Sequence, residues 1–190
     1  MPKTIDRRAG ARASYHHGDL KQALLDAARA EVNANGAQGL SLASLARRAG
    51  VAQSAPYRHF TDREELLAAV ATAGFEEFTT ALLAAAQSGT EEGAVQRMAE
   101  TYLRFGSENV ELYRLMFASR LVPESASDSH LRKAAQASFQ PLLDHISKAA
   151  ASTIRGRALV FWAQLHGLVM LNADGLFPET LDELGEHLHL

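Results

Sequence analysis

The sequence of 190 residues contains no cysteine, only five prolines and a single tryptophan. The lack of cysteine excludes disulfides and thiolate metal sites, and nothing in the composition suggests an oxidising compartment. Sustained alternation of Val, Ile and Thr is also missing, so we expect no β-strands. Hydrophobic residues make up 47% of the chain, which is typical of a folded globular protein.

Long apolar runs are missing too. Residues 1–14 are polar and basic, without the apolar stretch of a secretion signal, so we expect no signal peptide. The longest nearly apolar stretch, 158–173, is shorter than the ~20 residues that cross a bilayer. It is also interrupted by Gln164, His166 and Asn172. We therefore expect a cytoplasmic protein that makes no membrane contact.

Motifs of the common enzyme classes are absent from the sequence. It has no G-x-S-x-G, H-E-x-x-H, P-loop or dinucleotide fingerprint. The pair His16-His17 resembles a metal pair but has no partner at helical spacing. Other His and Asp residues are scattered without triad or metal spacing: His130, Asp144, His145, His166 and Asp174. We predict no enzyme, no catalytic residues, no metal and no cofactor.

Charge is distributed unevenly along the chain. Residues 1–60 hold nine Lys/Arg and four Asp/Glu, a net of +5, whereas residues 61–190 hold ten and eighteen, a net of −8. A basic first third on an acidic remainder suggests that a polyanion binds the first third. Ordinary scatter of surface charge is the alternative, because +5 is modest for a phosphate-binding surface.

Nearly every stretch of the chain has a helical pattern of apolar residues. In the first helix, for example, one stripe is formed by Leu20, Leu24, Ala27, Ala28 and Val32. We predict an all-α fold of about nine helices, with a loop at 123–129 and a kink at Pro141. The expected helices cover 18–35, 41–49, a short segment ending near residue 60, 62–87, 91–108, 111–120, a seventh ending near 150, 153–173, and a last helix from Pro178.

The stretch 41–60 is the most informative part of the sequence. Two short helices can cross closely here because Ala46 is small, and Gly50 tolerates the positive φ of a tight turn. Leu42, Leu45 and Val51 give the unit a core. These features favour a helix-turn-helix whose second helix enters a DNA major groove.

The same stretch resembles the tetracycline-repressor (TetR) family of bacterial transcription regulators. The resemblance rests on A-R-R-A-G-V at 46–51 and Y-R-H-F at 57–60, followed by a charged helix start. The run Y-H-H-G-D-L at 15–20 is similar to the opening of one branch of the family. The resemblance implies a dimeric regulator, more often a repressor than an activator, that binds operator DNA and is released by a small molecule.

DNA contacts follow from the resemblance position by position. The start of the recognition helix is expected to face base edges, because Gln can pair with adenine and Ala can touch a thymine methyl. Phosphate contacts are expected from the flanking residues, and Arg63 stands where the family usually has Lys. The predicted DNA-binding residues are Ser41, Gln53, Ser54, Ala55, Tyr57, Arg58, His59 and Arg63.

The recognition helix departs from the family pattern at its start. Ala52 replaces the usual Ser or Thr, so the common cap is missing. Ser54 is an alternative cap, which places Pro56 in the first turn. Two simpler readings stay open here: Tyr57 as a core aromatic, and the basic residues of 1–14 as a solvated tail.

The second half of the chain is expected to bind the effector and to form the dimer. The pattern W-x-x-x-H-G at 162–167 resembles the WHG subgroup of TetR C-terminal domains. The segment 153–173 is apolar on two sides, so one side is expected to face the protomer and the other a partner. Pocket candidates are aromatic or Met residues at inward positions: Phe75, Phe78, Tyr102, Phe105, Met116, Phe117, Phe139, Trp162 and His166. Dimer candidates are Phe161, Leu165, Gly167 and Leu168. The resemblance implies that the eighth and ninth helices form a four-helix bundle in the dimer.

These inferences divide the chain into three parts. Residues 1–14 are a basic arm, 15–61 a three-helix helix-turn-helix domain, and 62–190 a helical domain for effector binding and dimerisation. The predicted partners are double-stranded operator DNA with a pseudo-palindromic sequence, a small and largely apolar effector, and a second copy of the chain. The rival prediction is an architectural DNA-binding protein without a pocket, which would not prefer one operator over random DNA.

Overall fold

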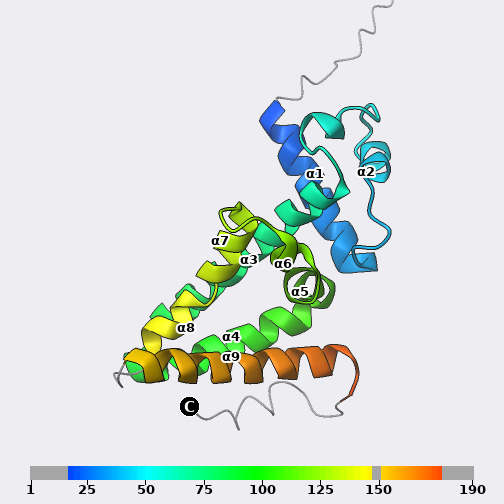
Figure 1. Cartoon of the computed structure of the whole chain (residues 1–190). Coiled ribbons are helices and arrows are strands. Elements are labelled where there is room, and N and C mark those ends of the chain that lie inside the picture. Colours follow the sequence, from blue (N-terminus) through cyan, green and yellow to red (C-terminus); the bar gives the residue numbers. More distant parts are fainter. Residues whose placement is uncertain (1–16, 147–150, 177–190) are drawn as a thin grey trace, which may run out of the picture.

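The structure, a computed structural model, describes residues 17–146 and 151–176. Within these ranges the chain is helical and contains no strand, as the all-α prediction requires. The predicted basic arm and the predicted last helix from Pro178 lie outside the described residues. Figure 1 shows a small N-terminal unit, which we call the head (17–62), above a larger unit, the body (63–146 and 151–176).

The head is built from α1 (His17–Asn35), α2 (Leu42–Arg48) and the single 3₁₀ turn η1 (Pro56–Arg58). Leu24, Ala28 and Val32 of the predicted apolar stripe are buried and Leu20 is partly buried, and α1 is followed by Gly36, whose φ of 72° suits glycine. A capping box starts α2, since Ser41 Oγ accepts from the Ser44 N–H at 3.1 Å and Ser44 Oγ accepts from the Ser41 N–H at 3.2 Å. Leu42 and Leu45 of α2 pack into the head core.

Helix α3 (Arg63–Gln87) connects the head to the body. The side chain of Asp62 caps it, and the carboxylate of Glu65 accepts from the N–H and hydroxyl of Thr61 at 2.6 and 2.7 Å. These hydrogen bonds lower the pKa of Glu65. Helix α3 is long and apolar enough to cross a membrane, but it passes through the body as a core helix packed against α4, α5 and α7.

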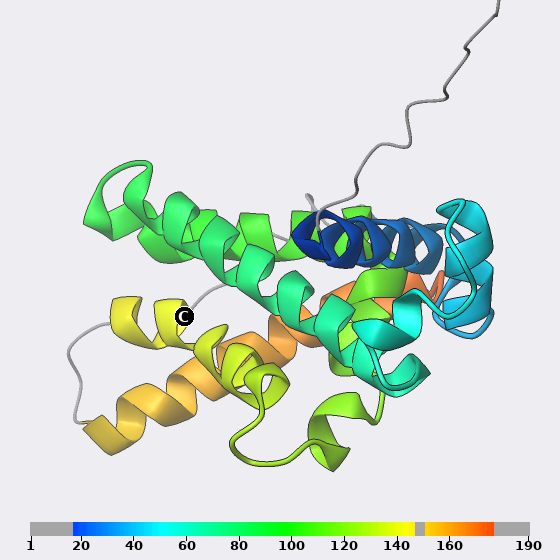
Figure 2. The same cartoon turned by 90° about the horizontal axis from the view of Figure 1, so that it is seen from above.

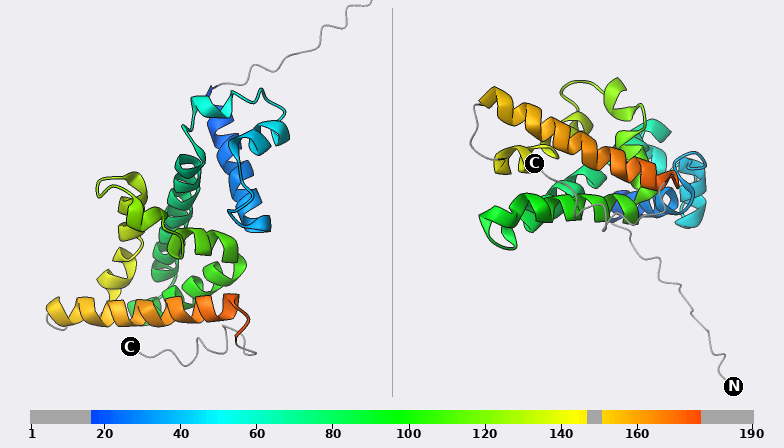
Figure 3. Two further views of the ribbon diagram at one scale, coloured as in Figure 1. Left: turned by 45° about the vertical axis from the view of Figure 1, so that its right-hand side comes forward. Right: turned by 90° about the horizontal axis from the view of Figure 1, so that it is seen from below.

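The body consists of α3 with η2 (Glu91–Gly93), α4 (Ala94–Glu108), α5 (Val110–Phe117), α6 (Leu121–Glu124), α7 (His130–Ala137), α8 (Gln140–His145) and α9 (Ala151–Ala173). Helix α4 packs against α3 and α9, and α7 and α8 run beside α3 (Figure 2). Helix α9 crosses the end of the body farthest from the head (Figure 3). Helices α4 and α9 approach closely at Gly106, where an added Cβ would lie 2.4 Å from Val169 Cγ1.

Three predicted boundaries in the body are wrong. The sixth predicted helix ends at Phe117 instead of residue 120, and Pro123 lies inside the short α6 instead of a loop. The seventh predicted helix is divided into α7 and α8 at Ser138 and Phe139. Pro141 does not kink a helix, because it occupies the first turn of α8, where its missing N–H removes no hydrogen bond.

Candidate functional site

The turn after α2 replaces the predicted third helix. The segment 52–60 forms i→i+3 bonds, such as Ala55 N–H to Ala52 O at 2.9 Å and His59 N–H to Pro56 O at 2.9 Å. No side chain caps the turn, and Pro56 has no N–H to give to an α-helical ladder. The predicted recognition helix is therefore reduced to η1, whose start at Ala55 has no side-chain cap.

Most of the predicted DNA contacts lie together on the exposed side of this turn. Tyr57 is 54% exposed, so it is not the core aromatic that the alternative proposed. Gln53, Ser54 and Arg58 are exposed as well, whereas Ala55 is partly buried. Phe60 is buried in the head core. The turn thus leaves an aromatic, a cation and two polar side chains exposed, while Phe60 packs in the head core.

Ser41 has fewer free groups than the sequence prediction assumed. Its backbone N–H donates to the Ser44 hydroxyl at 3.2 Å. Its own hydroxyl oxygen accepts from the Ser44 N–H. The proton of the Ser41 hydroxyl is the group left for a phosphate.

His59 and Arg63 are tied into the head. Nε2 of His59 is buried without a partner among the described residues, so a phosphate contact would use Nδ1. Arg63 donates through Nε to Leu40 O at 2.9 Å and through Nη2 to Ala37 O at 2.6 Å. Arg63 therefore joins the start of α3 to the α1–α2 connection, a structural role that the sequence prediction of a phosphate contact missed.

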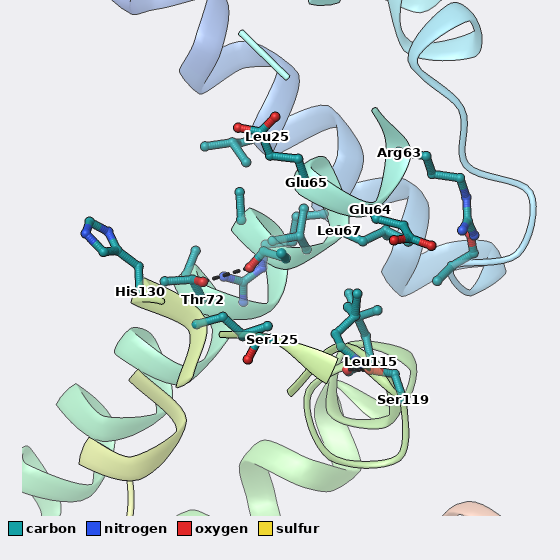
Figure 4. A pocket seen from close by; sticks show the side chains of 18 of the residues that line it. Leu25, Arg63, Glu64, Glu65, Leu67, Thr72, Leu115, Ser119, Ser125 and His130 are labelled. Atoms are coloured by element: carbon teal, nitrogen blue, oxygen red, sulfur yellow. Dashed lines mark hydrogen bonds between the residues drawn. The ribbon is translucent and has the colours of Figure 1, made fainter. Parts of the chain in front are cut away.

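An open groove of about 1170 Å³ separates the head from α5–α7. Figure 4 shows Leu25 of α1 and Glu65 of α3 on one side, with Leu115 of α5 and the following Ser119 on the other. The head and the body are therefore joined through α3 and through contacts of α1 with α5, while the space between them is not filled.

A cluster of aromatic rings occupies the middle of the body. It includes a T-shaped pair of Phe78 and Tyr102 with centroids 5.0 Å apart, and Trp162 lies 5.2 Å from Tyr102. The ring of Phe139 forms a T-shaped pair with Trp162, with centroids 5.3 Å apart. The cluster brings together eight of the nine pocket candidates: Phe75, Phe78, Tyr102, Phe105, Phe117, Phe139, Trp162 and His166.

Met116, the ninth candidate, lies elsewhere. It packs on α3, where a Cβ added to Gly74 would lie 2.8 Å from the Met116 sulfur. Tyr113, which the sequence prediction did not include among the pocket residues, takes a place in the cluster, with its ring centroid 4.6 Å from that of Phe117. The signal for Tyr113 was its i,i+4 spacing to Phe117 on one face of α5.

A chain of hydrogen bonds runs through this ring cluster. The hydroxyl oxygens of Tyr102 and Tyr113 are 2.7 Å apart, and the Tyr113 hydroxyl lies 2.7 Å from Nδ1 of His166. Burial raises the pKa of both tyrosines and lowers the pKa of His166, so all three groups are held in the uncharged form. The cluster is therefore an apolar interior that contains one connected polar element.

Helix α5 contacts both the ring cluster and the head. Tyr113 and Phe117 face the cluster, and a neighbouring side packs against α1. Glu111 lies beside Gly36 at the end of α1, where an added Cβ would meet its carboxylate oxygen at 2.9 Å. Arg114 donates to Glu111 at 2.6 Å, and to Asp174 at 2.7 Å and the Ala173 carbonyl at 3.0 Å at the end of α9. A path of direct contacts thus joins α9, α5 and α1.

Two of the four predicted dimer residues are unavailable to a partner. Phe161 and Leu165 are 3% and 1% exposed because they pack into the core of their own protomer. Leu168 is partly buried against the same core, and nothing lies within 4 Å of a Cβ added at Gly167. The exposed side of α9 carries small and apolar residues beside three polar ones: Gly156, Leu159, Val160, Ala163 and Leu171, with Arg155, Arg157 and Gln164.

Both parts of the chain match known families. Residues 24–70 match the family described as bacterial regulatory proteins, tetR family, and residues 95–189 match the tetracyclin repressor-like C-terminal domain. An uncharacterized HTH-type transcriptional regulator of Haemophilus influenzae is 28% identical over 167 residues, which cover 86% of this chain and 78% of that protein.

Solved structures are similar over most of the chain. A protein of unknown function from Rhodococcus sp. RHA1 superposes with a TM-score of 0.79 at 33% identity, covering 92% of this chain and 94% of the other. A TetR family transcriptional regulator from Thermus thermophilus has the same fold, with a TM-score of 0.63, 17% identity, and coverage of 85% and 92%.

Proposed function

The chain belongs to the tetR family of bacterial regulatory proteins, and from this premise we propose that it is a repressor that binds a palindromic operator as a dimer and releases it when a small effector binds. Like its family, it is a DNA-binding transcription regulator and not an enzyme. The observation that carries the proposal is the turn after α2, which holds Tyr57 and Arg58 outward over a buried Phe60. We also propose that the protein is cytoplasmic. Trp162, His166 and Gly167 are the basis for proposing that its C-terminal domain belongs to the WHG subgroup.

The head is the proposed operator-binding surface. We assign the exposed Tyr57 and Arg58 to phosphate contacts, and the exposed Gln53 and Ser54 to base edges of a major groove. The proposed domain limits are 15–61 for DNA binding and 62–190 for effector binding and dimerisation, with 1–14 as an arm that adds phosphate contacts. Arg63 is assigned to the joint between the two domains.

The exposed side of α9 is the proposed dimer surface. Val160 and Leu159 are 61% and 50% exposed, and open space over Gly156 and Gly167 permits a second helix to approach closely. Pairing of two α9 helices about a two-fold axis would present two identical heads to DNA, which is why we propose a palindromic operator.

A charge on this side of α9 tests the dimer. We expect Val160→Glu to convert the protein from dimer to monomer in sedimentation, because a buried unpaired carboxylate at a dimer contact is costly. Leu83→Glu is the matched control, since Leu83 is exposed on α3 at 40% and lies outside the proposed surface. A Val160→Glu protein that stays dimeric would place the dimer contact elsewhere.

The ring cluster is the proposed effector site, and α3 and α5 are the proposed links to the head. Helix α3 is held to the head by Arg63, and α5 contacts α1 beside Glu111. A ligand that favours one arrangement of the cluster would shift both helices, and the open groove leaves the head room to turn.

Binding to a DNA fragment from the promoter beside the protein's own gene tests the operator function. We expect tight, salt-sensitive binding that exceeds binding to random DNA by about 10³-fold or more. Tyr57→Ala should abolish most of it with no loss of thermal stability, because the Tyr57 ring is mostly solvent-exposed. Equal binding to all DNA, unchanged in Tyr57→Ala, would instead support an architectural DNA-binding protein.

A further inference from the structure

Helix α9 ends in a well-defined turn beside α5. The N–H of Leu176 donates to Leu171 O at 3.1 Å. The N–H of Gly175, whose φ is 68°, donates to Asn172 O at 2.9 Å. These two hydrogen bonds form a Schellman motif, which leaves the carbonyl of Ala173 outside its pairs. The last turn of α9 also has no basic residue of its own to stabilise the negative end of the helix dipole.

Arg114 of α5 binds this end of α9. Its Nη2 donates to Ala173 O at 3.0 Å and to Asp174 Oδ1 at 2.7 Å. Its Nη1 donates to Glu111 Oε1 at 2.6 Å. A planar guanidinium can donate to two acceptors in different directions at once, so one side chain joins the end of α9 to a carboxylate on α5. We call Glu111, Arg114 and Asp174 the Arg114 bridge.

The other end of the Arg114 bridge lies against the head. Figure 1 shows α5 between the C-terminal end of α1 and the end of α9. A Cβ added at Gly36, the residue after α1, would lie 2.9 Å from Glu111 Oε2. The last turn of α1 has no basic residue, and a carboxylate alone is unfavourable at the negative end of a helix dipole. Without Arg114, the charge of Glu111 would therefore repel the end of α1.

Helix α1 packs against both α3 and α5. At α3 the head is held by the hydrogen bonds of Arg63 and by an ion pair of Arg29 with Glu77. At α5 the carboxylate of Glu111 lies beside the end of α1. Because an open groove lies between the head and α5–α7, the head has room to turn about α3. The contact with α5 limits this turn.

We propose that the Arg114 bridge sets the spacing between the two half-sites of the operator. In a dimer paired through α9, two-fold symmetry fixes the two α9 helices relative to each other. Each bridge then holds its own head relative to α9, so the two heads are kept at one distance. The inference rests on the dimeric operator binding proposed above and adds the residues that determine which operator length is bound.

Operators of altered length test the proposal. Selection from random duplex DNA with the full-length wild-type protein provides the operator, and one base pair is then inserted or removed between its half-sites. One base pair moves a half-site by about 3.4 Å and turns it by about 35°. We expect the wild type to bind the selected spacing about tenfold or more tightly than either altered spacing.

Arg114→Met removes the bridge and keeps an unbranched side chain. We expect the preference for the selected spacing to fall about three- to tenfold, because each bridge is partly exposed but a dimer contains two of them. Affinity for DNA with a single half-site should be unchanged, since no proposed DNA contact is removed. A spacing preference that Arg114→Met retains would overturn the proposal.

Two further variants separate the bridge from a general loss of charge. Asp174→Ala should lower the spacing preference in part, and it should add nothing to Arg114→Met, because both residues act in one bridge. Arg120→Met is the matched control, since Arg120 also lines the groove but pairs with Glu124 one turn away. An equal fall in Arg120→Met, or additive effects of the two bridge variants, would contradict the proposal.

The distance between the heads can also be measured without DNA. The chain contains no cysteine, so Ala43→Cys, at an exposed position of α2, allows one spin label on each head. In double electron–electron resonance we expect one narrow distance distribution in the dimer, which Arg114→Met broadens and Arg120→Met leaves unchanged. Equal widths in all three proteins would overturn the proposal.

The outcomes distinguish this inference from the proposed function. A wild type that binds its selected DNA with no spacing preference would refute the palindromic operator, and the inference would fail with it. A wild-type preference that survives in Arg114→Met would refute the inference alone and leave the proposed operator function in place.

Discussion

The head and the body differ in the side chains that form their cores. The head core is aliphatic, built on residues such as Leu24, Val32 and Leu45, and Phe60 is its one buried phenylalanine or tyrosine in the described segment 17–62. The body core combines aliphatic residues with a cluster of rings, and a hydrogen-bonded chain runs through that cluster. The head keeps its other aromatic, Tyr57, at the surface, whereas the body gathers its rings inside.

The two cores differ in how easily their side chains can rearrange. A core of interlocked aliphatic side chains has few alternative arrangements, and it holds the turn at 52–60 in one shape. A ring cluster with partly exposed members and a polar chain can exchange one ring for another with little loss of contact area. The head is therefore suited to present fixed contacts to DNA, and the body is suited to respond to a ligand.

The largest effect is expected from a cavity in the head. Leu45 is fully buried, so Leu45→Ala should lower the free energy of unfolding by about 3 kcal/mol and remove DNA binding. Trp162 is the single tryptophan and lies in the body, so its emission reports on the ring cluster alone. If the two regions are separable, that emission stays native under conditions in which far-UV circular dichroism shows the head to be unfolded.

Leu82→Ala in the body provides the comparison. Leu82 is 2% exposed and lines the small void beside Trp162, so the emission should change while the head fold is retained. Coincident loss of circular dichroism and Trp162 emission in both variants would show that head and body unfold as one unit, and the contrast drawn between them would fail.

A smaller effect is expected where two body helices touch. Gly106→Ala places a methyl group 2.4 Å from Val169 Cγ1, and overpacking of this kind costs about 1–3 kcal/mol. Gly39→Ala is the control in the head, because nothing lies within 4 Å of its added Cβ and its φ is not positive. Thermal unfolding of both variants, followed at 222 nm, should show a fall only for Gly106→Ala. An equal fall in both would mean that close helix contact in the body is not the cause.

The sequence was most informative at positions where a physical requirement can be met by only one or two residue types. Gly50, with φ of 66°, and the buried Ala46 were predicted from the needs of a tight crossing and turn. The third helix was mispredicted because the family pattern suggested a helix where the turn has no side-chain cap and begins with Pro56. The hydrogen bonds of Arg63 to Ala37 and of Tyr113 to His166 were not predicted. Their partners lie 26 and 53 residues away in the chain, and such contacts leave no local sequence pattern.

The joint between the two regions gives a third prediction. Arg63→Ala removes two hydrogen bonds to the Ala37 and Leu40 carbonyls, which should cost about 1–2 kcal/mol of stability. The variant should also bind the operator more weakly, because the head is no longer held in one orientation on α3. The emission of Trp162 should stay native. Glu64→Ala, at the exposed neighbouring position, is the control. Weaker DNA binding at unchanged stability would instead indicate that Arg63 contacts a DNA phosphate directly.

The smallest effect is expected from protonation inside the ring cluster. Burial lowers the pKa of His166 in the folded state, so the unfolded chain binds a proton at this side chain first as pH falls below about 6.5. The neutral His166 side chain contributes to the free energy of unfolding. This contribution is fully present above the unfolded pKa and is lost as pH falls through the folded pKa, because a protonated Nδ1 can no longer accept from Tyr113. Urea unfolding of wild type and His166→Gln between about pH 8 and pH 5 isolates it, since the other seven histidines are common to both proteins. The wild type should lose more stability than the variant on acidification. Parallel curves would mean that His166 keeps its ordinary affinity for protons, and the uncharged polar chain that distinguishes the body from the head would not exist.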